Sequence, residues 1–109
     1  MANASIDFTL HCSMSKVWNL LSDEREMTFR TGIYHTLQNR AFYDRLEYMI
    51  ENDTLKGKRV ILFMEERGGV RIAVMDECSA KKLTAAPLLG RTLQKQLDDF
   101  QYRLRKEIG

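Results

Sequence analysis

The sequence contains little proline, cysteine or glycine: one, two and six residues respectively among 109. Collagen-like chains and flexible linkers need much more proline and glycine, so both classes are excluded. Cys12 and Cys78 are too few and too far apart for a disulfide framework. Together with His11 and His35 they show none of the spacings that hold zinc. We therefore expect two free thiols and no bound metal.

Long apolar runs and a strong net charge are also missing. The longest apolar run extends only from Val60 to Met64, whereas a membrane-spanning helix needs about 20 apolar residues. The N-terminus lacks the pattern of a secretory signal. The net charge is +2, which does not favour a strong nonspecific binder of nucleic acids. These observations predict a cytoplasmic protein that does not contact a membrane.

Motifs of catalytic and cofactor-binding sites are absent as well. The sequence has no glycine-rich phosphate loop, no nucleophile elbow and no metalloprotease helix. No two carboxylates stand at a spacing typical of acid–base catalysis. The composition, with 44% hydrophobic and 29% charged residues, is instead typical of a packed globular domain. We expect one domain that is not an enzyme and holds no cofactor.

The first 21 residues are predicted to form a strand and a helix. Apolar residues alternate with polar ones over residues 5–10, which is typical of a half-buried strand. Ser13 or Ser15 can cap the helix that follows. An apolar stripe continues this helix over two turns, at Met14, Val17, Trp18 and Leu21.

Two more helices are expected before residue 55. The first covers residues 27–37 and buries Phe29, Ile33 and Leu37 at intervals of four. The second begins at Asn39, because four apolar residues follow at helical spacing: Phe42, Leu46, Met49 and Ile50. Residues 52–53 can end this helix through a left-handed residue.

A β-hairpin is predicted next, with strands over 59–65 and 70–76 on either side of Gly68 and Gly69. A register in which paired residue numbers sum to 135 matches apolar and opposite-charge partners: Phe63–Ile72, Ile61–Val74 and Arg59–Asp76. The last helix begins near Pro87. Its apolar residues recur nearly as a heptad seam, at Leu89, Leu93, Leu97, Phe100, Leu104 and Ile108.

Three helices, a hairpin and a final helix are the elements of a winged helix-turn-helix domain. The stretch from KVWNLL, at residues 16–21, to Asp76 resembles the winged-helix regulators of the PadR, MarR and archaeal-repressor type. The segment FYDRLEYMIENDTL, residues 42–55, resembles their recognition helix and its turn. Asp53 departs from the family pattern, where glycine is common, and so does the N-terminal strand.

This resemblance implies an α+β fold, a winged helix-turn-helix with three helices, a β-hairpin wing and a long C-terminal helix. The single domain would cover residues 1–109, with a helical core over 13–55, the wing over 56–78 and a dimerisation helix over 86–108. The seam from Leu89 to Ile108 would join two copies into a homodimer.

The function implied is a sequence-specific regulator of transcription, a repressor that binds double-stranded DNA as a homodimer. Helix residues at the start of the recognition helix would contact base edges, and cations of the wing would contact phosphates. The residues expected to bind DNA are Gln38, Asn39, Arg40, Tyr43, Asp44, Lys56, Lys58, Arg67 and Arg71.

Two alternatives remain open. The same scaffold could serve as a protein-binding adaptor or antagonist, because a fold does not determine a function. The opening strand with the segment from Met14 to Asp23 is also similar to the start of helix-grip ligand-binding domains, and the long last helix suits that fold. A helix-grip domain needs more strands between its two ends, however, and residues 38–52 show helical spacing.

Overall fold

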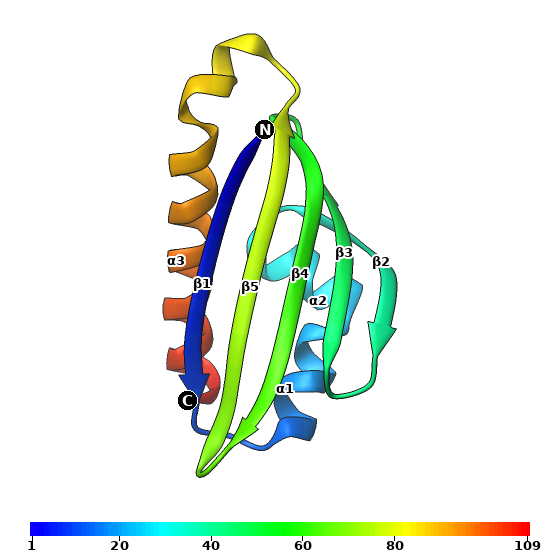
Figure 1. Ribbon diagram of the computed structural model, residues 1–109, viewed down its shortest axis with the longest axis vertical. Coiled ribbons are helices and arrows are strands. Elements are labelled where there is room, and N and C mark those ends of the chain that lie inside the picture. The colour runs from blue at the N-terminus through cyan, green and yellow to red at the C-terminus, as the bar shows by residue number, and fades with distance from the viewer.

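Five strands and three α-helices make up the computed structural model, which describes residues 1–109. The chain order is β1 (Ala2–Leu10), α1 (Met14–Leu21), α2 (Glu24–Thr31), β2 (Tyr34–Ala41), β3 (Arg45–Glu51), β4 (Leu55–Glu66), β5 (Gly69–Ala80), the 3₁₀ helix η1 (Leu83–Leu88) and α3 (Leu89–Ile108). The strands form one antiparallel sheet in the order β1-β5-β4-β3-β2 (Figure 1).

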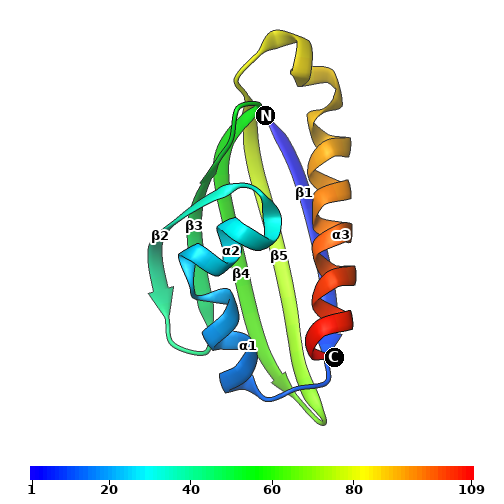
Figure 2. The same cartoon turned by 180° about the vertical axis from the view of Figure 1, so that it is seen from behind.

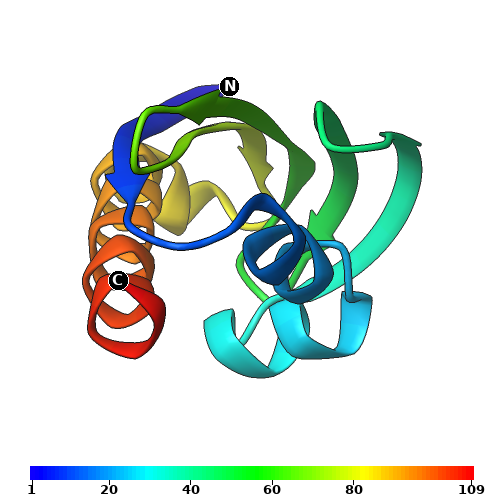
Figure 3. The ribbon, with the colours of Figure 1, turned by 90° about the horizontal axis from the view of Figure 1, so that it is seen from below.

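All three helices lie on one face of the curved sheet (Figures 2 and 3). The long helix α3 packs mainly along β1, while α2 packs on β2 at the opposite edge. We call the face toward the helices the inner face and the other the outer face. The core lies between the inner face and the helices. None of the helices has both the length and the hydropathy needed to cross a membrane.

The expected first strand and first helix are confirmed. In β1 every second side chain faces the helices, and this alternation is the period of a half-buried strand. Ser13 caps α1, since its hydroxyl accepts a hydrogen bond of 3.3 Å from the backbone N–H of Lys16. Trp18 faces the core, where its ring meets that of Phe63 edge to face at 4.9 Å.

The prediction of a helix over residues 27–37 is wrong in both of its bounds. The helix α2 begins earlier, because the Asp23 carboxylate accepts from the backbone N–H groups of Arg25 and Glu26 at 2.9 and 3.1 Å. It ends at Gly32, whose φ of +71° is the left-handed conformation that glycine adopts without strain. Phe29 is not buried as expected but 87% exposed.

The helix expected from Asn39 does not exist. Residues 34–51 form the hairpin of β2 and β3 instead, and the chain reverses at Tyr43, which has a φ of +61°. In β3 the side chains of Leu46, Tyr48 and Ile50 face the core at strand spacing. With no recognition helix and a five-stranded sheet, the winged helix-turn-helix prediction is wrong.

The β4–β5 hairpin is confirmed, and it is longer than expected. Its register pairs Phe63 with Ile72, Ile61 with Val74 and Arg59 with Asp76, which are the three predicted pairs. The hairpin is not a wing that projects from a helical domain. It forms the centre of the sheet, with β1 added on one side and β3 on the other.

The expected C-terminal helix is confirmed as α3, but its role as a dimerisation helix is not. Five of the six seam side chains are buried against the chain's own core, namely Leu89, Leu93, Leu97, Phe100 and Leu104. The sixth, Ile108, is partly buried against the same core. The seam is long because it covers a long sheet, and its side chains are not exposed to a second copy.

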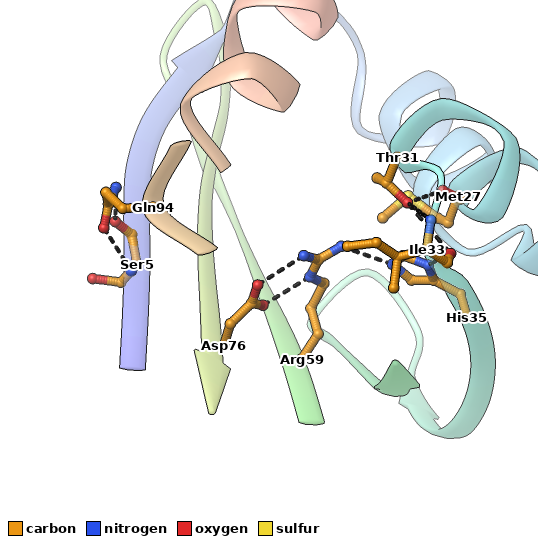
Figure 4. A network of polar contacts seen from close by, with 8 residues as sticks. All are labelled: Ser5, Met27, Thr31, Ile33, His35, Arg59, Asp76 and Gln94. Atoms are coloured by element: carbon orange, nitrogen blue, oxygen red, sulfur yellow. Dashed lines mark hydrogen bonds and ion pairs between the residues drawn. The ribbon is translucent and has the colours of Figure 1, made fainter. Parts of the chain in front are cut away.

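Side chains of the helices occupy both edges of the sheet. At the β2 edge, the backbone N–H groups of His35 and Leu37 donate to the Thr28 hydroxyl at 2.9 Å and to the Glu24 carboxylate at 2.5 Å. At the β1 edge, the Gln94 amide bonds both the N–H and the carbonyl of Ser5 (Figure 4). These contacts satisfy backbone groups that an open edge would leave free for another strand.

Candidate functional site

The residues expected to bind DNA do not share a helix. Gln38, Asn39 and Arg40 lie on the edge strand β2, Tyr43 and Asp44 in the turn after it, and the remaining four on β4, β5 or the turn between them, namely Lys56, Lys58, Arg67 and Arg71. Two of the cations are already paired on the outer face, Lys58 with Glu47 at 3.0 Å and Arg71 with Asp7 at 2.7 Å. The prediction of DNA binding is therefore wrong. It assumed a recognition helix, and no helix presents these side chains to a major groove.

A charged network crosses the inner face of the sheet. Arg59 of β4 and Asp76 of β5 are each 2% exposed, and two hydrogen bonds of 2.7 Å join the guanidinium to the carboxylate. Arg59 Nη1 also donates to His35 Nε2 at 2.8 Å, while His35 Nδ1 donates to the Ile33 carbonyl at 2.8 Å (Figure 4). The network thus connects β5, β4, β2 and the turn after α2.

The network holds its histidine neutral. Burial, with the positive charge of Arg59 as a second cause, lowers the pKa of His35 to about 3. The neighbouring Cys78 is also buried, and burial raises the pKa of its thiol to about 11. A neutral imidazole, a paired carboxylate and a protonated thiol suit a structural network, and no reactive nucleophile results from this arrangement.

The hollow that we consider the candidate site lies between α2 and α3, and we call it the interhelical groove. It consists of two neighbouring hollows. The one that we call the outer hollow, of about 400 Å³, lies toward the C-terminal end of α3, and the one that we call the inner hollow, of about 100 Å³, lies nearer the middle of that helix. Both are lined by Arg30, Phe100 and Arg103. Phe29, Leu104 and Glu107 complete the outer hollow. Thr31, Gln96 and Asp99 complete the inner hollow.

One face of α3 and one end of α2 form this groove. The α3 residues recur at helical spacing, from Gln96 through Phe100 to Glu107, so they lie on one side of the helix. Across from them, α2 contributes consecutive residues from its last turn. Arg30 connects the two walls, because its guanidinium forms a two-point ion pair with the Glu107 carboxylate. This pairing lowers the pKa of Glu107 below its usual value.

The walls of the groove carry apolar and polar groups without partners in the chain. The ring of Phe29 is 87% exposed and contacts no other ring, while Phe100 beside it is buried in the core. Asp99 and Arg103 take part in no ion pair. The amide oxygen Oε1 of Gln96 is buried and has no hydrogen-bond donor. Unused groups of this kind are what a bound molecule can contact.

A larger hollow of about 650 Å³ lies on the outer face of the sheet. Most of its polar groups are already engaged: Arg45 and Lys58 with Glu47, Asp76 with Arg59, and Gln94 with Ser5. The side chains of Asn3 and Glu77 also line it and form no hydrogen bond or ion pair, but no aromatic ring does. A third hollow of about 490 Å³ lies beside the β2 edge and contains Gln38, Asn39 and Arg40 among its mostly polar lining. The interhelical groove is the better candidate, because it combines aromatic walls with polar atoms that lack partners.

Comparisons with known proteins agree with this architecture. No model of a known protein family matches the sequence, and no curated protein matches it. Solved structures do match over the full fold. A START superfamily protein from Mycobacterium smegmatis is 10% identical, with a TM-score of 0.82 over 99% of this chain and 97% of that one. A Bacillus halodurans protein solved in solution is 12% identical, with a TM-score of 0.76 over 100% and 98%.

The Aha1 dimer from Colwellia psychrerythraea is a third similar structure, 5% identical with a TM-score of 0.74 over 99% of this chain and 96% of that one. At these identities the comparisons show the fold alone. The fold is the helix-grip arrangement, in which an antiparallel sheet curves around a long C-terminal helix. The resemblance to winged-helix regulators is therefore wrong, and the helix-grip alternative is the better interpretation of the sequence.

Proposed function

We propose that this protein binds a small amphipathic organic molecule in the interhelical groove. The observation that carries the proposal is the 87% exposed ring of Phe29 beside Phe100 and Leu104 in a hollow of about 400 Å³. This volume lies within the range of about 300–1,000 Å³ typical of small-molecule sites. A ligand that covers the Phe29 ring removes apolar surface from water, which favours binding.

We also propose a binding role without catalysis. The titratable groups of the inner face, Arg59, Asp76 and His35, hold one another in place and do not line the groove. The groove itself presents two carboxylates, two guanidiniums and an amide, all of which can orient a ligand. The arrangement of the helices supports this proposal, since α2 and α3 lie on the same face of the sheet and the groove is lined by residues of both.

A titration of ¹⁵N-labelled protein with 2-naphthol and with 2-methoxynaphthalene tests the proposal. The amide signals of Phe29, Phe100 and Arg103 should shift with saturation. Replacing Phe29 by Ala should weaken binding by about tenfold or more, because the ring loses roughly 1.5–3 kcal/mol of burial on binding. The fold should not change, since the ring is almost fully exposed.

Phe42→Ala is the matched control, because Phe42 is also an exposed phenylalanine but lies in the β2–β3 turn, outside the groove. This variant should bind the naphthalene probes as the wild type does. Equal losses in both variants, or saturable shifts confined to the outer face of the sheet, would contradict the proposed site.

A further inference from the structure

The inner hollow of the groove is rich in hydrogen-bond acceptors. Gln96 Oε1 is buried there without a donor. The Asp99 carboxylate lines the same hollow and forms no ion pair within the chain. A carboxylate accepts hydrogen bonds only, and it does so whichever way the Gln96 amide is turned.

Thr31 adds a third acceptor. Its hydroxyl hydrogen is committed to the Met27 carbonyl at 2.7 Å, and its oxygen accepts from the backbone N–H of Ile33 at 3.3 Å (Figure 4). The hydroxyl therefore has no hydrogen left for the hollow and can only accept. The guanidinium of Arg30, which also lines the hollow, is already bound by Glu26 and Glu107.

We propose that the groove selects ligands whose polar end carries a hydroxyl or amino hydrogen-bond donor, which enters the inner hollow and donates to Gln96 Oε1 and Asp99. This inference rests on the proposed function, because it assigns the polar end of the same ligand. Its apolar body lies in the outer hollow against Phe29, Phe100 and Leu104. The small size of the inner hollow, about 100 Å³, suits a group of one or two heavy atoms.

An anionic polar end fits less well. A carboxylate in the inner hollow would face the Asp99 carboxylate and the Gln96 oxygen, and like charges that share a small site repel one another. Arg103 is the one guanidinium of the groove without an ion pair, and it lines both hollows, so it can equally contact the body of the ligand in the outer hollow. A polar end that only accepts hydrogen bonds leaves Gln96 Oε1 without a donor, so the inner hollow discriminates against it.

Four probes share a naphthalene ring and differ in their polar end, so they test which polar end the groove prefers. They are 2-naphthol, 2-(aminomethyl)naphthalene, 2-methoxynaphthalene and 2-naphthoate. The first two should bind at least about fivefold more tightly than the methoxy compound, because the methoxy compound leaves the buried Gln96 Oε1 without a donor. The naphthoate should bind no better than the methoxy compound. A preference for the amine over the alcohol would identify an ammonium ligand, and the reverse preference would identify a hydroxyl ligand.

Gln96→Leu should weaken the binding of 2-naphthol to the level of 2-methoxynaphthalene and leave the latter unchanged. Asp99→Asn should weaken the amine more than the alcohol. Gln101→Leu is the control, since Gln101 lies on α3 outside the groove. Equal Phe29-dependent binding of all four probes, or tightest binding of the naphthoate, would overturn the donor inference and leave the proposed function intact. Failure of every probe to bind would overturn both.

Discussion

Arg59 and Asp76 face each other across β4 and β5, and the guanidinium binds the carboxylate through two hydrogen bonds of 2.7 Å. A second pair with the same geometry, Arg71 and Asp7, lies on the outer face and is about half exposed. The two pairs differ in burial, in the additional His35 contact of Arg59 and in their strand register, so the chain contains both a buried and an exposed two-point ion pair.

Asp76→Asn should lower the free energy of unfolding by about 3–5 kcal/mol, because it leaves the buried Arg59 charge uncompensated. Asp7→Asn should cost less than about 1 kcal/mol, since water screens the exposed pair. Guanidinium unfolding of both variants measures the difference. Replacing both buried partners, Arg59→Met with Asp76→Leu, should recover most of the loss. Equal costs for the two asparagine variants would show that burial does not decide the strength of these pairs.

Stability should fall with pH below about 6.5 because of His35. In the unfolded chain His35 takes up a proton near its ordinary pKa of 6.5, whereas in the folded protein its pKa is lowered to about 3. Between these values the unfolded state binds more protons, so the free energy of unfolding decreases as the pH falls, by about 1.4 kcal/mol per pH unit at most.

Unfolding curves between pH 7 and pH 4 should show a flatter dependence for His35→Gln than for the wild type. Glutamine keeps an acceptor for Arg59 Nη1 but does not titrate. His11→Gln exchanges an exposed histidine outside the network and serves as the control. Parallel slopes in all three proteins would mean that His35 is not held neutral by the fold.

Two glycines should respond to alanine with opposite signs. At Gly32 an added Cβ meets nothing within 4 Å, but the φ of +71° is strained for alanine. Gly32→Ala should therefore destabilise by about 1 kcal/mol. At Gly90, in the first turn of α3, the space is also open and the φ is not positive. Gly90→Ala should stabilise by about 0.4–1 kcal/mol. Thermal unfolding of both variants measures the two changes in Tm. Changes of the same sign would show that the left-handed conformation of Gly32 is unimportant.

The sequence predicts the β4–β5 register because opposite charges and branched apolar residues repeat over a long hairpin with glycines at its turn. The sequence does not predict the strands of residues 34–51, because the apolar residues of this segment also match a helical period. Met49 lies on the outer face and Phe42 in the turn, and both residues completed a false helical stripe. The alternation of Leu46, Tyr48 and Ile50 was the signal for a strand, but such a short run cannot be told from a helix by spacing alone.

The interhelical groove could not be predicted, because it depends on where two separate helices meet. Phe29 is an apolar residue in a helix and therefore suggests a core position, but it is 87% exposed in the last turn of α2. Gln96, Asp99 and Arg103 read as a solvated helix face. Asp99 and Arg103 are in fact exposed, and only the fold shows that this face of α3 lies beside the last turn of α2.

During folding, the docking of the helices on the sheet edges competes with the association of these edges with other chains. Gln94 reaches Ser5 across 89 residues of sequence, so the β1 edge stays open until α3 docks. Closing so long a loop is slow compared with forming a local hairpin. Until then the free edge can pair with another chain, and that competing step is bimolecular whereas docking is not. The yield of refolded protein should therefore rise on dilution, and loss of the Gln94 contact should make this yield more sensitive to protein concentration.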